Sequence, residues 1–286
     1  MKIPLLLFRN GLHHKNVDAL RNYPDFEIFE SNNPDDIPKF QYIYSPNHPI
    51  DVKLYPQQKF LFGPHFSVFP ESNLSLVFGH HSVYVHPSLW ASNVWKQYFN
   101  IYQIPILPLP FGVDTNKFQP NPSNPKTEVF LYYKRRNPQE FHFVTQYLNS
   151  LKIPFRVFDY VNQYSEQDYL HFLQHAKFGF ILDAHESQGF AIQEALSCNV
   201  PLFVWSVTNL NQEYGANYPS VLATTVPYWD NRCGEVVYNQ DDIATQFPIF
   251  LSIVERNLYQ PRQYILENLT REICSQKMKD LLLSIP

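Results

Sequence analysis

The chain has few of the features that mark several large classes of protein. Its three cysteines, Cys198, Cys233 and Cys274, are far apart in the sequence, which fits neither a disulfide framework nor a zinc site and indicates a reducing compartment. The net charge of −4 provides no basic surface for a nucleic-acid backbone. The apolar run at residues 3–8 is far shorter than the roughly 20 residues of a membrane span and lacks a signal-peptide cleavage site. We therefore expect a cytoplasmic protein with no nucleic-acid partner and no transmembrane segment.

Several catalytic motifs are also absent from the sequence. It contains no GxSxG nucleophile turn, no GxxxxGK[ST] phosphate loop and no HExxH metal motif. No GxGxxG follows the first expected strand, which argues against a dehydrogenase. Since the chain has only 8 glycines, each glycine at the end of a strand or the start of a helix is more informative than usual.

Apolar and aromatic side chains, in contrast, are abundant. Hydrophobic residues make up 44% of the sequence and charged residues 17%, which indicates sizeable cores and argues against a disordered chain. A length of 286 residues is sufficient for two domains. The 24 Phe and 19 Tyr residues indicate aromatic cores. A surface on which sugars stack against aromatic rings is the alternative interpretation.

Short apolar strands alternate with helices along the chain, which predicts an α/β architecture. We expect one βα domain over residues 1–112 and a second over 113–261, with a linker rich in proline and asparagine at 119–126. Apolar residues at helical spacing predict a single amphipathic helix over 262–286. The expected strands are 3–8, 26–29, 41–44, 59–62, 74–78, 83–86, 104–109, 128–133, 155–158, 178–182 and 201–205. The expected helices are 15–21, 88–99, 138–151, 165–175 and 190–197.

The most informative stretch, residues 183–197, lies between a buried strand and a helix. In α/β sheets, ligands bind at the carboxyl ends of the strands. Gly189 is expected to begin the helix, so that the backbone N–H groups of residues 189–191 face an anion such as a diphosphate. Glu186 precedes these amides and Glu194 follows them, and each carboxylate is suited to sugar hydroxyls. The alternative is a helix with an acidic first turn and a solvated Glu194.

A run of three cations ends the first strand of the second domain. Lys134, Arg135 and Arg136 are expected at the same edge of the sheet as Glu186, because the carboxyl ends of parallel strands lie together. Lysine and arginine there are suited to pyrophosphate oxygens. A solvated basic strand end is the alternative interpretation.

These residues resemble the GT-B glycosyltransferases, in particular the retaining, nucleotide-sugar-dependent group with a Glu-x7-Glu signature. Glu186 and Glu194 match that signature, with Gly189 three positions after the first glutamate. Residues 109–120 are similar to the family's interdomain segment, and residues 262–286 are similar to its last helix. The resemblance implies two Rossmann-like domains facing across a cleft, with a C-terminal helix that packs back on the first domain.

The resemblance also implies roles for individual residues. Glu194 would bind the donor ribose, and Glu186 would bind the hydroxyls of the transferred sugar. Lys134 and Arg135 would hold the diphosphate, and His65 or His86 would be the first-domain histidine that contacts the transferred sugar. The other residues expected at the donor are Ser187, Gln188, Gly189, Phe190, Ala191, Tyr160 beside the base, and Gly11 in a shortened glycine-rich loop.

The implied activity is transfer of a sugar from a nucleoside-diphosphate sugar to a hydroxyl of a glycan, lipid or protein, with retention of configuration. No Asp-x-Asp occurs in the chain, which argues against the metal-dependent transferases of the other main fold. We therefore expect neither a metal nor a cofactor. Because the first domain, residues 1–112, is shorter than in the family, a non-catalytic nucleotide- or sugar-binding protein is an alternative. A nucleotide-sugar epimerase is another.

Overall fold

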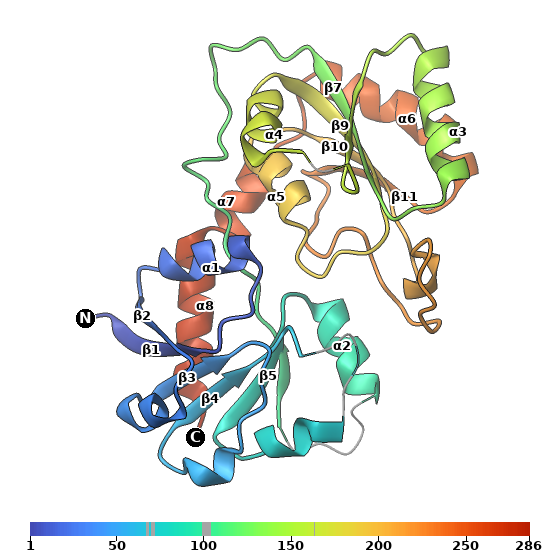
Figure 1. Ribbon diagram of the computed structural model, residues 1–286. Helices are drawn as coiled ribbons and strands as arrows, with labels where there is room; N and C mark the ends of the chain where they lie inside the picture. Colours follow the sequence, from blue (N-terminus) through green and yellow to red (C-terminus); the bar gives the residue numbers. More distant parts are fainter. Residues whose placement is uncertain (67–68, 70–71, 99–103, 163) are drawn as a thin grey trace. The chain divides into compact units, whose positions relative to one another are not determined.

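The computed structural model describes residues 1–66, 69, 72–98, 104–162 and 164–286. The chain divides into two compact units, which are described separately below. Unit 1 comprises Met1–Gly112 and Leu269–Pro286, and unit 2 comprises Val113–Asn268. Each unit has its own parallel sheet (Figure 1), so the predicted α/β class is confirmed. Within the described residues, no helix is long and apolar enough to cross a membrane.

Unit 1 is built on a six-stranded parallel sheet with the order β2-β1-β3-β4-β5-β6. Its inner strands are largely apolar and buried because a parallel sheet is covered on both faces. Trp95 and the sheet residues Phe60, Phe62 and Tyr84 form the centre of its core. The strands are β1 (Ile3–Phe8), β2 (Phe26–Ser31), β3 (Tyr42–Ser45), β4 (Lys59–Phe62), β5 (Ser82–His86) and β6 (Ile106–Pro108), and the α-helices are α1 (His14–Arg21), α2 (Leu89–Tyr98) and α8 (Arg271–Ser284).

Short 3-10 helices replace longer crossover helices in much of unit 1. They are η1 (Pro34–Lys39), η2 (Val52–Leu54) and η3 (Ser72–Val77). The strand predicted at 74–78 is therefore wrong, because η3 occupies that stretch. The carbonyl oxygen of Val77 accepts a hydrogen bond from the Ser82 hydroxyl at 2.6 Å, and the place beside β4 in the sheet belongs to β5.

Unit 2 has a five-stranded parallel sheet with the order β11-β10-β9-β7-β8. Helices α3 and α6 cover one face of this sheet, and α4 and α5 cover the other (Figure 1). The strands are β7 (Glu128–Lys134), β8 (Arg156–Asp159), β9 (Ala176–Asp183), β10 (Leu202–Trp205) and β11 (Gly234–Val237). The helices are α3 (Pro138–Ser150), α4 (Glu166–Leu173), α5 (Phe190–Ser197), α6 (Gln240–Glu255) and α7 (Pro261–Asn268), with the 3-10 turn η4 (Leu210–Gln212).

The single helix predicted over 262–286 is two helices, α7 and α8. Helix α7 packs against α5 in unit 2, whereas α8 belongs to unit 1. The break lies at Thr270, whose hydroxyl caps α8 by accepting a hydrogen bond from Ile273 N at 3.2 Å. Gly112 passes so close to this cap that a Cβ atom there would lie 2.5 Å from Arg271 Cα. Periodicity alone misses the break because apolar spacing continues through it.

Candidate functional site

The carboxyl ends of β7 and β9 meet at one edge of the unit 2 sheet. Lys134 and Asp183 are register partners, and Ala184 N donates a hydrogen bond to Lys134 O at 3.0 Å. The loop that follows β9 therefore starts beside the run of cations that ends β7. A second backbone bond, from Glu186 N to Thr224 O at 3.0 Å, fixes that loop to the long connection between β10 and β11.

Lys134 and Glu186 form a largely buried ion pair at this edge, and their side chains are 13% and 17% exposed. The Lys134 Nζ atom also lies 4.7 Å from the centre of the Tyr160 ring, a cation–π arrangement. Burial opposes the charge on Lys134, but the carboxyls of Asp183 and Glu186 outweigh it and raise its pKa. Burial raises the pKa of Glu186, but the Lys134 ammonium outweighs burial and holds this pKa below its usual value.

Arg135 points into a different set of partners. Its guanidinium donates a hydrogen bond to Glu213 Oε1 at 3.1 Å, yet the side chain remains 48% exposed. The buried carboxylate of Glu213 also lies 2.7 Å from His185 Nε2. Burial lowers the pKa of His185, although Glu213 opposes this. Sequence reasoning missed Glu213, because it belongs to the connection after β10, where no motif marks it.

Arg136 is buried and is not available to bind a ligand at the sheet edge. The side chain is 1% exposed, and its guanidinium bonds both carboxylate oxygens of Glu140 at 2.8 Å. It also donates to Asp183 O at 3.1 Å and to Trp205 O at 2.7 Å. Arg136 therefore ties β9, β10 and α3 together, and the expectation of three cations at the ligand edge is reduced to Lys134 and Arg135.

Gly189 begins α5, as expected, in a left-handed conformation with φ +77° and ψ +48°. No side chain caps this helix, and its first backbone N–H groups point out of its N-terminus. The loop before it is held by a buried amide pair, in which Gln188 Nε2 donates to Gln193 Oε1 at 2.8 Å. Ser187 is exposed beside it. The arrangement leaves the positive end of α5 directly after the Glu186 loop.

Glu194 lies inside α5 and is 2% exposed, so the alternative of a solvated side chain is wrong. It interacts electrostatically with Lys117 and with Tyr164. Tyr169 of α4 donates a hydrogen bond from its hydroxyl to Ala191 O at 3.0 Å and so packs α4 against the first turn of α5. A carboxylate on the buried face of this helix can bind hydroxyl groups with little competition from water.

The first-domain candidates belong to unit 1. Burial, with a smaller contribution from His65, lowers the pKa of His86 to about 3, so this imidazole is neutral at pH 7. Its ring lies 5.2 Å from that of Tyr84 and 4.7 Å from that of Trp95, measured between centres. His65 N donates to Pro46 O at 2.8 Å. A Cβ added at Gly11 would overlap the side-chain amide of Asn47, which would have to move.

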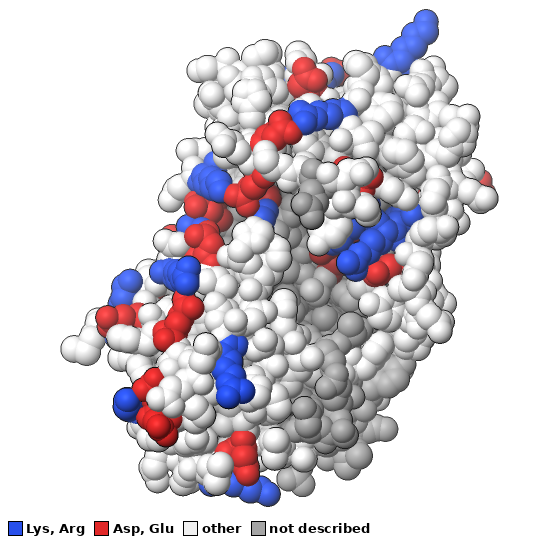
Figure 2. All heavy atoms as spheres, in the orientation of Figure 1, with Lys and Arg blue, Asp and Glu red and all other residues white. Residues whose placement is uncertain are grey.

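Several charged side chains away from this sheet edge form ion pairs with one another. Figure 2 shows several Lys and Arg side chains on this face beside Asp and Glu side chains, whereas others lie among uncharged residues. Examples within unit 2 are the pairs Lys117–Glu166 and Arg156–Asp168. Among the described residues, no group of three His, Cys, Asp or Glu side chains has the geometry of a metal site.

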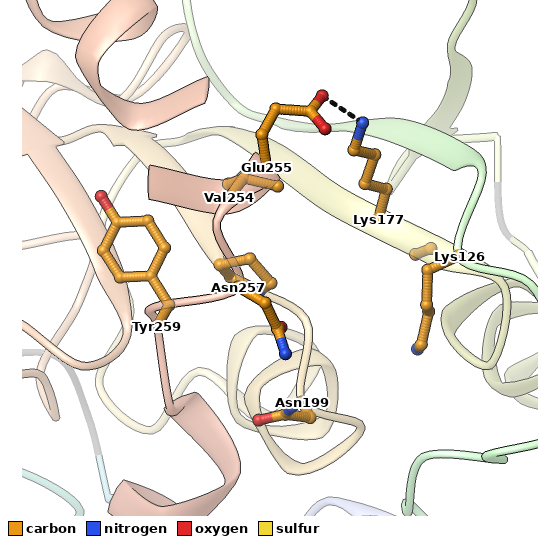
Figure 3. A pocket seen from close by; sticks show the side chains of 9 residues that line it. Lys126, Lys177, Asn199, Val254, Glu255, Asn257 and Tyr259 are labelled. Carbon is orange, nitrogen blue, oxygen red and sulfur yellow. Dashed lines mark hydrogen bonds and ion pairs between the residues drawn. The ribbon is translucent and has the colours of Figure 1, made fainter. Parts of the chain in front are cut away.

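A cavity of about 200 Å³ lies at the opposite, amino edge of the unit 2 sheet (Figure 3). It is lined by residues that precede or begin β7, β9 and β10, among them Lys126 and Lys177, and by the end of α6. The Lys126 ammonium donates a hydrogen bond to Leu173 O at 3.0 Å, at the carboxyl end of α4. None of the residues predicted for the donor site lines this cavity.

The sequence matches no family model and no curated protein, but the fold matches solved structures. Sucrose-phosphate synthase from Thermosynechococcus elongatus aligns over 98% of both chains, with 12% identity and a TM-score of 0.57. WaaG, a glycosyltransferase involved in lipopolysaccharide biosynthesis, aligns over 99% of this chain and 100% of its own, with 11% identity and a TM-score of 0.52. The N-terminal domain of trehalose-6-phosphate phosphatase from Candida albicans aligns over 99% and 96%, with 10% identity and a TM-score of 0.59. With its two parallel-sheet α/β units, the chain has the fold of the GT-B glycosyltransferases.

Proposed function

We propose that the protein is a glycosyltransferase that moves a sugar from a nucleoside-diphosphate sugar to a hydroxyl of a glycan, lipid or protein. The observation that carries this proposal is the edge of unit 2 where the N-terminus of α5 follows the loop of Glu186, and Glu186 pairs with Lys134 at the end of β7. Arg135 is the next residue along the chain. A diphosphate is the ligand that such an edge suits, because it takes both amide donors and cations. The fold shared with solved glycosyltransferases supports the same conclusion.

In this proposal, the diphosphate binds at the first amides of α5 and at the guanidinium of Arg135. Arg135 is half-exposed and hydrogen-bonded to Glu213, so the incoming phosphate competes with a carboxylate for it. As the bond between the sugar and the phosphate oxygen breaks, negative charge grows on the departing diphosphate. Cations and amides already in place stabilise that charge without reorganisation. They supply the charge for which other transferases use a divalent ion, so we propose a metal-independent reaction.

The two glutamates of the signature have separate roles in this proposal. Glu186 binds hydroxyls of the transferred sugar, while Glu194, one to two turns further along α5, binds the donor ribose. Gln188, Ser187 and Tyr160 border the same pocket. The bond from the anomeric carbon to the diphosphate breaks, and the acceptor oxygen bonds to that carbon on the same face, so the configuration is retained. The departing diphosphate takes the proton of the acceptor hydroxyl.

Nucleotide binding tests the proposal first. UDP, GDP and ADP are titrated into the protein, and the expected result is a measurable affinity for at least one of them. The absence of affinity at millimolar concentration would contradict the proposal. Binding without turnover of any nucleotide sugar would favour a non-catalytic binding protein.

Steady-state kinetics then separates the roles of the residues. Arg135→Ala is expected to lower kcat about a hundredfold, the scale of losing one charge-stabilising donor, with a smaller effect on nucleotide affinity. Glu194→Gln is expected to weaken donor binding more than it lowers kcat, because ribose hydroxyls gain no charge during transfer. Arg256→Ala, at an exposed position after α6, is the matched control and should leave both constants unchanged. Near-normal turnover in Arg135→Ala would show that Arg135 does not bind the departing diphosphate.

A further inference from the structure

The ion pair of Lys134 and Glu186 includes a third buried ionisable side chain, that of Asp183. Asp183 ends β9 and is 0% exposed, and its carboxyl interacts with both members of the pair. One ammonium thus faces two carboxyls. If both carboxyls were ionised, the cluster would hold a net negative charge away from water, which is costly in a protein interior.

The hydrogen bonds around Asp183 show where a proton is needed. Its Oδ1 accepts a hydrogen bond from Ala184 N at 2.7 Å. Its Oδ2 is buried and accepts no hydrogen bond from any N–H or O–H group in the described part of the chain. The carboxyl of Glu186 lies within hydrogen-bonding reach of the Asp183 side chain. Two carboxyl groups make a hydrogen bond only when one of them is protonated.

The surroundings place that proton on Asp183. Burial raises the pKa of Asp183 well above its usual value; Lys134 opposes this increase, and the proximity of Glu186 adds to it. Glu186 instead has the Lys134 ammonium as a direct partner, which keeps it ionised. Tyr132 of β7 also interacts with Asp183, and its own pKa is raised by burial. Arg136 binds only the backbone oxygen of Asp183; His185, next along the loop, pairs with Glu213.

We propose that Asp183 is a positioning residue that acts in its protonated form, donating its carboxyl O–H to the Glu186 carboxylate. This bond holds Glu186 in place when Lys134 turns from Glu186 to the donor diphosphate. The movement of Lys134 to the diphosphate rests on the proposed function, whereas the protonated state of Asp183 does not. No covalent bond forms or breaks, and the proton stays on Asp183.

The variant Asp183→Asn distinguishes a protonated acid from a charged one. The amide of asparagine donates to Glu186 and accepts from Ala184 N, as a protonated aspartic acid does. Infrared spectroscopy at pH 7 should show the C=O stretch of a carboxylic acid in the wild type and its loss in Asp183→Asn. Asp241→Asn, at an exposed position, is the control and should keep the band. A wild-type spectrum without a band that depends on Asp183 would overturn the proposal.

The pH dependence of stability is a second readout that needs no activity. A carboxyl that is protonated in the folded protein and ionised in the unfolded chain makes folding take up a proton. The unfolding equilibrium constant of the wild type should then rise relative to that of Asp183→Asn by about tenfold per pH unit above the usual aspartate pKa of about 4. Urea unfolding from acidic to neutral pH measures this ratio. A constant ratio would overturn the proposal.

Turnover adds the functional part of the test. Asp183→Asn should keep kcat within about threefold of the wild type, because the donor to Glu186 is retained. Asp183→Val, which removes it, should lower kcat by about tenfold or more. An Asn variant as impaired as the Val variant would show that Asp183 acts as a charged carboxylate. If no nucleotide sugar binds, the proposed function fails while the infrared and stability results still decide the state of Asp183.

Discussion

Three consecutive cations at the end of β7 have three different surroundings. Lys134 is buried in an ion pair with Glu186, Arg135 is half-exposed beside Glu213, and Arg136 is enclosed by protein. Residue type and position in the sequence are nearly the same for all three. Their separation follows from the left-handed turn at Arg135, with φ +50°, which sends neighbouring side chains in different directions as the strand ends.

Arg136 is expected to be a stability residue. Arg136→Met keeps much of the side-chain volume but removes the guanidinium donors to the backbone oxygens of Trp205 and Asp183. Asp183 O keeps the Thr225 hydroxyl as a donor at 3.1 Å. Losing a hydrogen bond from a charged donor to a buried oxygen costs about 1.5–3 kcal/mol. Urea unfolding should show a loss of this size for Arg136→Met and almost none for the exposed control Arg256→Ala. A loss below about 1 kcal/mol would mean that other groups satisfy these oxygens.

His86 is expected to make unit 1 sensitive to acid. Its folded pKa of about 3 lies below the value of about 6.5 in an unfolded chain, so its contribution to stability is present above pH 6.5 and is lost as the pH falls toward 3. The loss amounts to about 1.4 kcal/mol per pH unit, or about 2 kcal/mol at pH 5. His86→Phe removes the titration, so unfolding measured between pH 5 and 7.5 should be flatter in the variant. Parallel pH profiles for the two proteins would contradict this expectation.

At the scale of secondary-structure elements, the start of α5 can be tested by glycine substitutions. Gly189 and Gly215 both have left-handed backbones, with φ +77° and +81°, and an added Cβ meets nothing closer than 3.5 Å at either. Gly189→Ala and Gly215→Ala should therefore each cost about 1–2 kcal/mol of stability. Only Gly189→Ala should also weaken nucleotide binding, by about tenfold, because it shifts the amides that face the phosphate.

Calorimetric titration of the two variants, with stability measured in parallel, provides the comparison. Equal affinities in both variants would show that the α5 N-terminus does not bind the nucleotide. Since the backbone strain is matched, a difference in affinity cannot come from a general loss of stability.

The sequence predicts those elements whose pattern is local. Helix α5 is found at its observed bounds because Gly189 precedes a clear apolar face, and the buried strands β1 and β9 are continuous apolar runs. The stretch from 206 to 261 yields no prediction, although it contains β11 and α6. Pro248 lies inside α6. Rules that end a helix at proline therefore fail to predict this helix.

The candidate site, like the fold, is predictable from the sequence only where its residues form a local pattern. Glu186, Gly189 and Glu194 are marked by their spacing, and the register of β7 with β9 places Lys134 beside them. The participation of Asp183 and Glu213 depends on burial and on the path of a long connection, which no spacing encodes. The enclosure of Arg136 likewise follows from packing among three elements and not from its neighbours in sequence.

At the scale of the whole molecule, two separate cores predict that local damage stays within one unit. Thr270→Ala removes the cap of α8 and should cost about 1 kcal/mol in unit 1. Hydrogen exchange read by mass spectrometry should then show amides of β1, β3 and β4 exchanging about fivefold faster. Exchange in β7 and β9 should be unchanged in this variant. In Arg136→Met, by contrast, the amides of β7 and β9 should exchange faster and those of β1, β3 and β4 should be unchanged. Equal loosening of both sheets by either change would show that the units unfold as one.

The division of unit 1 between the two ends of the chain has a consequence for biosynthesis. Unit 2 is one uninterrupted stretch, Val113–Asn268, whereas unit 1 also requires Leu269–Pro286. As the chain leaves the ribosome, the sheet of unit 1 emerges first but lacks α8, whose Met278 and Leu282 are buried. The same late segment supplies the backbone carbonyl of Ile285, which accepts a hydrogen bond from Lys59. Unit 2 can thus complete its fold before residues 269–286 have been synthesised, whereas unit 1 is closed only once α8 has emerged from the ribosome.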